Sequence, residues 1–350
     1  VPTYRPDLTR PADLVEEVAR LADFDTFAET VPTGPAGGLL IEQKRSRLAH
    51  NLLRGLGLIQ AINLPFVSAE ELVAFNDDAI GDVAPQVVKV RNPLREDQAN
   101  LRQSMLPGLL RNLRENRNRG IEPVALFEIG RVFFARPWAD DERVPEQPVR
   151  LALAAIGPFG GSQLGKANAA ADAKTALAIV QALGDGLGLS IRRRQGSSAG
   201  LHPTRTARLT VDGVSVGHAG ELHPDVAELF ELEGRVAVAE LDLTPLVAEL
   251  PAVQMAKVSN YPHVDFDLSF KVEMDHSADE LLSGTRSVSD LLEAASIFDD
   301  YRSDDDERAV AIRYRLRAAD RTLDADEITV VREKMIEAAT ALGATLRGGT

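Results

Sequence analysis

Four carboxylate side chains that could bind a metal ion lie near the start of the chain: Asp7, Asp13, Glu16 and Glu17. Asp13 is three residues from Glu16 and four from Glu17, so in a helix these side chains share one face. Crowded oxygen ligands of this kind suit Mg²⁺, which binds a few carboxylates and keeps several waters. A structural role fits equally well, because Asp13 as an N-cap with Glu16 three residues later forms a capping box, and acids in a first turn favour the helix dipole. The pattern leaves both interpretations open.

A row of arginines that could bind RNA lies near the C-terminus: Arg313, Arg315 and Arg317, with Arg321 just beyond. Because side chains alternate across a strand, the first three point to one face, opposite the apolar residues between them. Guanidinium groups bind phosphates through paired hydrogen bonds and stack on bases, and unpaired RNA is commonly read on open sheets. The alternative is that acidic residues of neighbouring segments neutralise the row: Asp265, Asp267 and the run 304–307.

Three other signals are weaker. The segment Gly160–Lys166 nearly spells a phosphate-binding loop, but Ala167 stands where a hydroxyl should bind Mg²⁺. His202, His218 and His223 lie beside Pro or Gly, which favours turns or loops over metal binding, and they do not have metal-ligand spacing. No G-x-S-x-G or similar sequence motif indicates a catalytic triad of Ser, His and Asp. We therefore predict neither catalytic nor cofactor-binding residues.

Composition limits the classes of protein to consider. The 350 residues are 44% hydrophobic, enough for two or three domains. They contain no long apolar run and no leader pattern, so we predict no membrane contact. The absence of cysteine excludes disulfides and thiolate sites and favours a reducing, cytoplasmic setting. A formal charge of −14 argues against bulk attraction of nucleic acid, so any RNA contact has to be local.

Hydrophobic spacing predicts the elements of the first 250 residues. Apolar positions at helical spacing predict a helix that starts at Asp13 and ends near Phe24. The breaker-rich segment 32–38 predicts a linker. Further helices are predicted at 41–56, 108–119 and 174–183, with strands at 126–134, 151–156, 206–211 and 236–241 and a turn before His223. This order favours a mixed α+β domain over a regular βαβ series.

The last hundred residues give the clearest pattern. Apolar and polar residues alternate over 265–274, as in a half-buried strand. A capping box at Ser277–Glu280 opens a helix, extended segments follow at 296–301 and 308–318, and a second helix starts at Asp324–Glu327 before a short strand at 344–347. The order β-α-β-β-α-β predicts a ferredoxin-like fold, with a four-stranded sheet and both helices on one face.

Several segments together resemble one family. The runs Asn92–Gln98, Leu101–Leu110 and Phe127–Phe133, then Leu201–Ala207 and Glu221–Pro224, are similar to the catalytic-like module of bacterial phenylalanyl-tRNA synthetase β subunits. Tyr261-Pro262, Phe298–Tyr301 and Asp320–Leu323 resemble the family's ferredoxin-fold anticodon-binding domain. Phe266, Ala309 and Thr204 depart from residues usual in that family. The chain begins without Met and in mid-pattern, so we expect a C-terminal fragment of such a subunit.

The resemblance implies a fold, partners and a division of labour. It implies the end of a preceding domain and a linker helix over 1–31, a class II synthetase-like antiparallel sheet with flanking helices over 32–252, and the ferredoxin-like domain over 257–350. ATP-dependent charging of tRNA-Phe with phenylalanine would occur in the α subunit of an α2β2 enzyme, since the G-x-G-x-x-R signature is missing here. The four acids would bind a Mg²⁺ shared with that subunit, and the arginine row would contact the tRNA anticodon stem.

Two alternatives differ in class. One is a stand-alone RNA-binding paralogue that never pairs with an α subunit, which co-purification would decide. The other is a metal-dependent hydrolase that uses the four acids, but the sequence offers neither a substrate pocket nor a general base for it. We also expect an exposed apolar helix face at Ile41, Leu48, Leu52 and Leu56.

Overall fold

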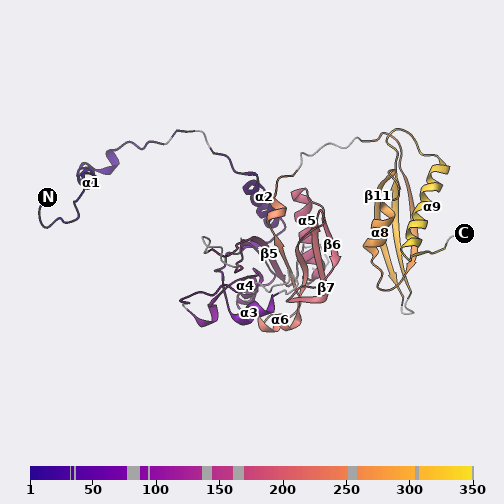
Figure 1. Cartoon of the computed structure of the whole chain (residues 1–350), viewed down its shortest axis with the longest axis horizontal. Helices are drawn as coiled ribbons and strands as arrows, with labels where there is room; N and C mark the ends of the chain where they lie inside the picture. Colours follow the sequence, from indigo (N-terminus) through magenta and orange to yellow (C-terminus); the bar gives the residue numbers. More distant parts are fainter. Residues whose placement is uncertain are drawn as a thin grey trace.

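The computed structural model of the chain describes residues 1–31, 33–34, 37–76, 87–93, 95–135, 144–160, 169–250, 258–303 and 307–348. Figure 1 shows, in chain order, a short helical segment, a larger sheet with helices and a smaller sheet with helices. Within these residues, no helix is both long enough and apolar enough to cross a membrane.

The N-terminal segment contains α1 (Pro11–Ala22) and the short 3-10 helix η1 (Phe24–Thr26). Helix α1 begins earlier than predicted, with Arg10 as the N-cap and Pro11 in the first turn, where its missing N–H costs no hydrogen bond. The prediction that Asp13 is the N-cap is therefore wrong. The Asp13 carboxylate instead accepts a hydrogen bond from the backbone N–H of Arg10 at 2.7 Å, which is the reciprocal half of a capping box.

The larger sheet contains the following strands among the described residues: β1 (Ile59–Gln60), β4 (Val124–Arg131), β5 (Val149–Ile156), β6 (Ile191–Gln195), β7 (Leu201–Val211), β8 (Val214–Leu222) and β9 (Val236–Asp242). Their order is β1-β4-β5-β9-β8-β7-β6, and the pairs are antiparallel apart from β1 with β4. A small ladder joins β2 (Phe66–Val67) to β3 (Asn100–Leu101), and the 3-10 turn η2 (Glu96–Gln98) precedes β3. The sheet is thus mainly antiparallel, as predicted.

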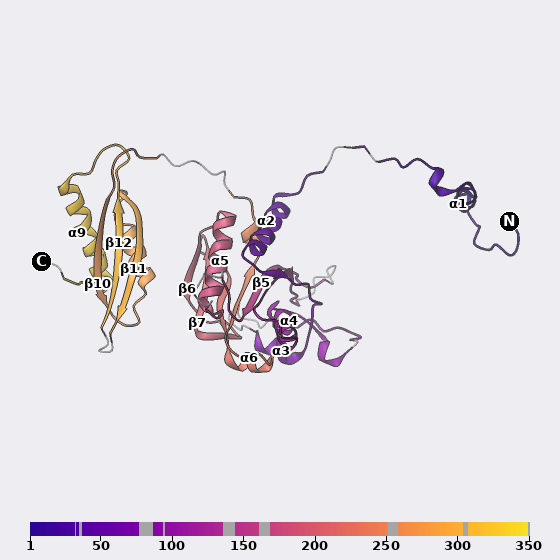
Figure 2. The same cartoon turned by 180° about the vertical axis from the view of Figure 1, so that it is seen from behind.

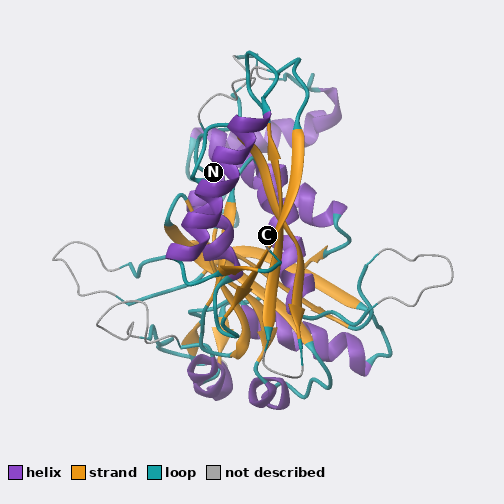
Figure 3. Ribbon diagram, turned by 90° about the vertical axis from the view of Figure 1, so that its right-hand side faces the viewer, coloured by secondary structure: helices purple, strands orange, loops and turns teal. Residues whose placement is uncertain are grey.

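Helices flank the strands on both faces (Figure 3). One face packs against α2 (Ile41–Gly55), α5 (Ala173–Leu187) and α7 (Thr244–Val247), and the other against α4 (Leu106–Asn118) and α6 (Pro224–Leu229); the short α3 (Ala69–Ala74) follows β2. Alternation along β5 explains the division, because Leu151 and Leu153 join the α5 core while Ala152 and Ala154 join the α4 core. The three predicted helices and four predicted strands of this region are confirmed.

Three strands of the larger sheet were not predicted: the short β1, β6 and β8. Strand β8 contains Gly217 and Gly220, which are residues typical of turns, and the sequence there indicated only a turn before His223. Gly217 is required by packing: its φ is +141°, and a Cβ atom would lie 2.1 Å from the carbonyl oxygen of Glu240 on β9. A glycine that permits close strand approach thus resembles a turn signal in the sequence.

The smaller sheet is ferredoxin-like, as predicted. Its elements are β10 (Val264–Val272), α8 (Ala278–Arg286), β11 (Leu292–Arg302), β12 (Arg308–Leu316), α9 (Ala325–Ala341) and β13 (Thr345–Leu346), in the strand order β11-β12-β10-β13 (Figure 2). Leu281 of α8 and Met335 of α9 pack on one face with Phe270, Ile312 and Tyr314. Burial of alternate residues leaves the other face of this sheet open.

Candidate nucleic-acid interface

Two arginines of β12 lie directly opposite two aspartates of β10 on the open face of the C-terminal sheet. Arg313 donates two hydrogen bonds to the Asp267 carboxylate, at 2.9 and 2.8 Å, and Arg315 donates two to Asp265, at 2.8 and 2.9 Å. The facing guanidinium groups hold the pKa of both aspartates below its usual range. Neutralisation across strands, one of the two interpretations of the sequence, therefore describes these two arginines in the free chain.

The other two predicted arginines are also paired. Arg317 donates to Glu293 of β11 at 3.2 Å and to the carbonyl oxygen of Ser259 at 3.3 Å. Arg321 donates to Asp320 at 3.0 Å and to Glu327 in the first turn of α9. Since α9 covers the opposite face of the sheet, the structure places Arg321 apart from the row of the other three. Asp304–Asp306 lie outside the described residues.

Sequence reasoning missed two aromatic rings of this open face. The guanidinium carbon of Arg313 lies 5.0 Å from the centroid of the Phe298 ring, and that of Arg347 lies 5.3 Å from the Tyr301 ring. Both rings come from β11 and are about half exposed, at 52% and 47%. The signal was in the segment Phe298–Tyr301, but a bulge between Ile297 and Asp299 breaks the alternation that would assign its faces.

Three of the four N-terminal carboxylates, those of Asp7, Asp13 and Glu17, are held by arginines and backbone N–H groups, and the side chain of Glu16 is exposed. Arg5 bridges Asp7 and Glu17, with 2.7 Å from its Nη2 to the Asp7 carboxylate, and Arg20 donates to Glu17 at 2.7 Å. Hydrogen bonds from Arg5 and then Arg20 lower the pKa of Glu17 to about 2. Within the described ranges, no group of three acidic, histidine or cysteine side chains is placed to hold a metal ion. The oxygen donors suit Mg²⁺, but this arrangement of them does not fit one.

The larger sheet carries buried charged residues whose partners are internal. Arg102 donates to Glu128 at 2.9 Å and to the carbonyl oxygen of Arg131 at 3.0 Å, and both members of the ion pair are almost fully buried. Nearby, Glu240 accepts hydrogen bonds from the Ser104 hydroxyl at 2.6 Å and the Met105 backbone N–H at 2.9 Å. These groups are occupied in holding α4 and the loop before it on the sheet.

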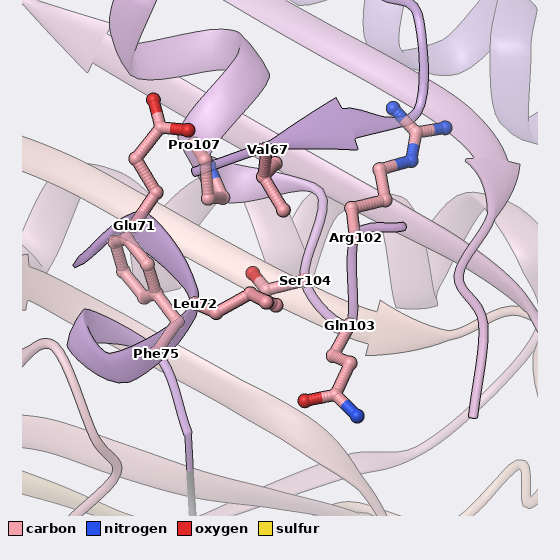
Figure 4. Close-up of a pocket in the computed structure, with 8 residues that line it drawn as sticks. All are labelled: Val67, Glu71, Leu72, Phe75, Arg102, Gln103, Ser104 and Pro107. Carbon is pink, nitrogen blue, oxygen red and sulfur yellow. The ribbon is translucent and has the colours of Figure 1, made fainter. Parts of the chain in front are cut away.

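A small hollow lies beside this buried pair (Figure 4). Its lining is Val67, Glu71, Leu72, Phe75, Arg102, Gln103, Ser104 and Pro107. Figure 4 shows the Arg102 guanidinium and the Glu71 carboxylate on opposite sides of the hollow, and Glu71 pairs with Arg111 of α4. The hollow therefore presents mainly apolar side chains, with its charged groups already paired.

The histidines have structural positions. His223 is the N-cap of α6 and its Nδ1 accepts a hydrogen bond from the Asp225 N–H at 3.2 Å, which confirms a turn role for that residue. His202 and His218 instead lie within β7 and β8, so the prediction of turn positions for them is wrong. The phosphate-loop-like segment has residues 161–168 outside the described part of the chain.

Comparisons with known proteins agree with this architecture. Family models match in order along the chain: the tRNA synthetase B5 domain over residues 1–24, the phenylalanyl tRNA synthetase beta chain CLM domain over 28–243, and the ferredoxin-fold anticodon binding domain over 259–347. The second match alone covers more than half of the chain. The chain belongs to the phenylalanyl-tRNA synthetase β-chain family. The resemblance found in the sequence and the predicted fold class are confirmed.

Relatives within this family span the whole chain. The phenylalanine–tRNA ligase β subunit of Nocardia farcinica is 36% identical across 99% of this chain and 44% of its own length, and that of Symbiobacterium thermophilum is 35% identical across 99% and 39%. The chain thus spans less than half the length of these relatives. A pyrrolysyl-tRNA synthetase structure from Desulfitobacterium hafniense matches 58% of the chain and 66% of its own length at 14% identity and a TM-score of 0.42, too distant for a functional argument.

Proposed function

We propose that the chain serves as the non-catalytic β-subunit part of a phenylalanine–tRNA ligase, in which it contacts the anticodon stem of tRNA-Phe while ATP-dependent charging occurs in an α subunit. The observation that carries the tRNA contact is the pairing of guanidinium groups with exposed rings on the open face of the C-terminal sheet. Units over 1–31, 32–252 and 257–350 and a cytoplasmic location form part of the same proposal.

The usual free energies of the two kinds of contact indicate that the aromatic rings contribute more to RNA affinity than the ion pairs do. Exposed ion pairs such as Arg313–Asp267 are worth about 0–1 kcal/mol, so an RNA phosphate can replace a carboxylate at small cost and with small gain. A base stacked on an aromatic ring is worth about 1–3 kcal/mol. Phe298 and Tyr301 therefore supply most of the binding energy of this face, and the arginines orient the RNA.

An exposed apolar surface supports association with the α subunit in an α2β2 enzyme. Ile41 and Leu48 of α2 are about 40% exposed, and the segment after it adds Ile59, Ile62 and Leu64, each more than two-thirds exposed. Such a patch is typical of a protein interface. Leu52, expected on this surface, is instead partly buried and packs against the core beside Gly186 of α5.

The shared Mg²⁺ site at Asp7, Asp13, Glu16 and Glu17 stays a prediction. For Glu17 to bind a metal, it has to exchange its arginine partners for the ion, and Arg5→Ala would favour that exchange. Isothermal titration of the α–β complex with MgCl₂ would then show tighter binding for Arg5→Ala than for the wild type. Weaker binding, or binding unchanged by Glu17→Gln, would refute the site.

The main test is phenylalanine-dependent tRNA charging by a complete β subunit co-expressed with an α subunit. We expect Arg313, Arg315 and Arg317 changed together to Ala to raise the KM for tRNA and leave kcat nearly unchanged. Replacement of the exposed arginines Arg95, Arg119 and Arg332 by Ala is the matched control and should do neither. Failure of the chain to associate with an α subunit, with RNA binding kept, would favour the stand-alone RNA-binding alternative.

A further inference from the structure

Four arginines form an exposed cluster on the larger sheet: Arg192, Arg193 and Arg194 of the edge strand β6 and Arg208 of β7. We call this set the β6–β7 arginine cluster. None of the four makes an ion pair or side-chain hydrogen bond with another residue in the described part of the chain. By contrast, Arg205 on the same strand β7 pairs with the buried Glu221 at 2.7 Å.

The strand register explains why the cluster lacks acidic partners. Arg194 lies directly opposite Arg208, and Arg192 lies opposite Thr210, so the facing positions are basic or neutral. One strand further, His218 faces Arg208, and the next position in that row is Glu240, whose carboxylate already accepts bonds from Ser104 and Met105. In the C-terminal sheet the same geometry places aspartates opposite arginines.

Alternation divides the cluster between the two faces of the sheet. Arg192, Arg194 and Arg208 point to one face and Arg193 points to the other. Neighbours on one face of a strand lie about 6.6 Å apart and cross-strand neighbours about 5 Å apart. Three long, flexible arginine side chains thus start from neighbouring positions on one face. The distances between these positions are similar to the distance between neighbouring phosphates in a sugar–phosphate backbone.

Protection of the sheet edge explains only part of this pattern. Charged side chains on an edge strand oppose pairing with another chain, and β6 is an edge. Arg208, however, lies on β7, which pairs with strands on both sides, so its side chain does not protect a sheet edge from pairing. An acidic protein partner fits less well, because stable protein interfaces bury an apolar or aromatic centre, and the exposed residues of β6 provide none.

We propose that the β6–β7 arginine cluster binds phosphates of an RNA backbone, as a second contact surface separate from the C-terminal sheet. The inference rests on the proposed tRNA-binding function and extends it to a part of the chain that the sequence did not indicate. Unpaired guanidinium groups bind phosphate through two hydrogen bonds without first giving up a carboxylate. The contact is independent of base sequence, because only phosphates are bound.

The test measures tRNA binding by the chain, alone and with a co-expressed α subunit, from 50 to 200 mM KCl. Each phosphate contact contributes about 0.9 to the slope of log K against log[salt], so Arg192, Arg194 and Arg208 changed together to Gln should reduce the slope by about 2–3. The affinity gap between wild type and variant then shrinks by about 40-fold across this range. Changing the same three residues to Lys should restore most of the slope, and Gln at Arg95, Arg119 and Arg332 should leave it unchanged.

The remaining outcomes overturn the inference in distinguishable ways. If the Gln variant keeps the wild-type slope but forms oligomers in light scattering, the cluster only protects the edge. If it keeps the slope but loses the α subunit, the cluster binds protein. If these variants match wild type while Phe298→Ala weakens tRNA binding, the proposed function stands without the second surface. If the wild-type chain binds no tRNA in either form, the proposed function fails as well.

Discussion

Replacing Glu128 by Gln removes the negative charge from a buried ion pair while keeping the shape of the side chain. In the wild type, the Glu128 carboxylate accepts hydrogen bonds from Arg102 at 2.9 Å and from the side-chain amide of Asn63 at 2.7 Å. The two charged side chains are only 6% and 3% exposed, so the Arg102 guanidinium would remain buried without a counter-ion. Loss of one partner of such a pair costs about 3–5 kcal/mol, a large part of the roughly 5–15 kcal/mol that stabilises a typical domain.

Urea unfolding followed by circular dichroism measures this cost, and hydrogen exchange of β4 and β5 assigns it to the larger sheet. Glu115→Gln is the matched control, because Glu115 makes an exposed pair with Arg119 and its loss should cost at most about 1 kcal/mol. In addition, Arg102→Met should cost less in the Glu128→Gln background than in the wild type, because the two residues are coupled. A Glu128→Gln cost no larger than that of the control would show that the buried charge is compensated in another way, and the reasoning would fail.

Three further predictions concern the C-terminal face, a buried phenol and a strand contact. Fluorescence anisotropy with an anticodon-arm RNA should show about 5- to 150-fold weaker binding for Phe298→Ala and at most about 5-fold weaker binding for Arg313→Ala. The reverse order would mean that charge, and not stacking, supplies most of the affinity. Burial raises the pKa of Tyr314 to about 12, so the unfolded chain loses its proton first. The ferredoxin-like unit should then lose about 2 kcal/mol between pH 10 and 12, and Tyr314→Phe should lose less over that interval in urea titrations. In thermal melts, Gly213→Ala should destabilise the larger sheet by roughly 1–2 kcal/mol, and Gly217→Ala by several times as much. Both glycines have positive φ, but only at Gly217 would a Cβ atom meet another strand. Equal costs would contradict the packing argument.

The ferredoxin-like unit was predictable because its signals are local. Alternation along β10 and the capping residues Ser277 and Asp324, which begin α8 and α9, depend only on residues close in sequence. Strands β6 and β8 escaped prediction because three successive arginines and closely spaced glycines hide the alternation of a strand. Their positions are fixed by pairing with β7 and β9, which is a tertiary effect.

The candidate sites could likewise be predicted only as far as they depend on residues close in sequence. Residue types and alternation placed Arg313 and Arg315 of β12 on one face, together with Arg317 just beyond the strand. The acids that Arg313 and Arg315 meet depend on a register that joins residues 46 and 50 positions apart. The bulge in β11 likewise decides that Phe298 lies under Arg313. At the N-terminus the sequence showed four acids, whereas Arg5, which holds two of them, carried no signal of its own.

The two arginine surfaces differ in whether their guanidinium groups are paired with carboxylates, and this difference decides what each can contribute to RNA binding. On the C-terminal sheet every guanidinium of the row is neutralised by a carboxylate at hydrogen-bond distance, so its field is short-ranged and contact requires exchange of partners. The β6–β7 arginine cluster keeps its charge, and in a chain of net charge −14 it offers an anionic RNA a local attraction that acts over about one Debye length, roughly 8–10 Å. Capture by the unpaired cluster would therefore govern the salt dependence and the rate of association, whereas stacking on the aromatic rings would govern the lifetime of the complex.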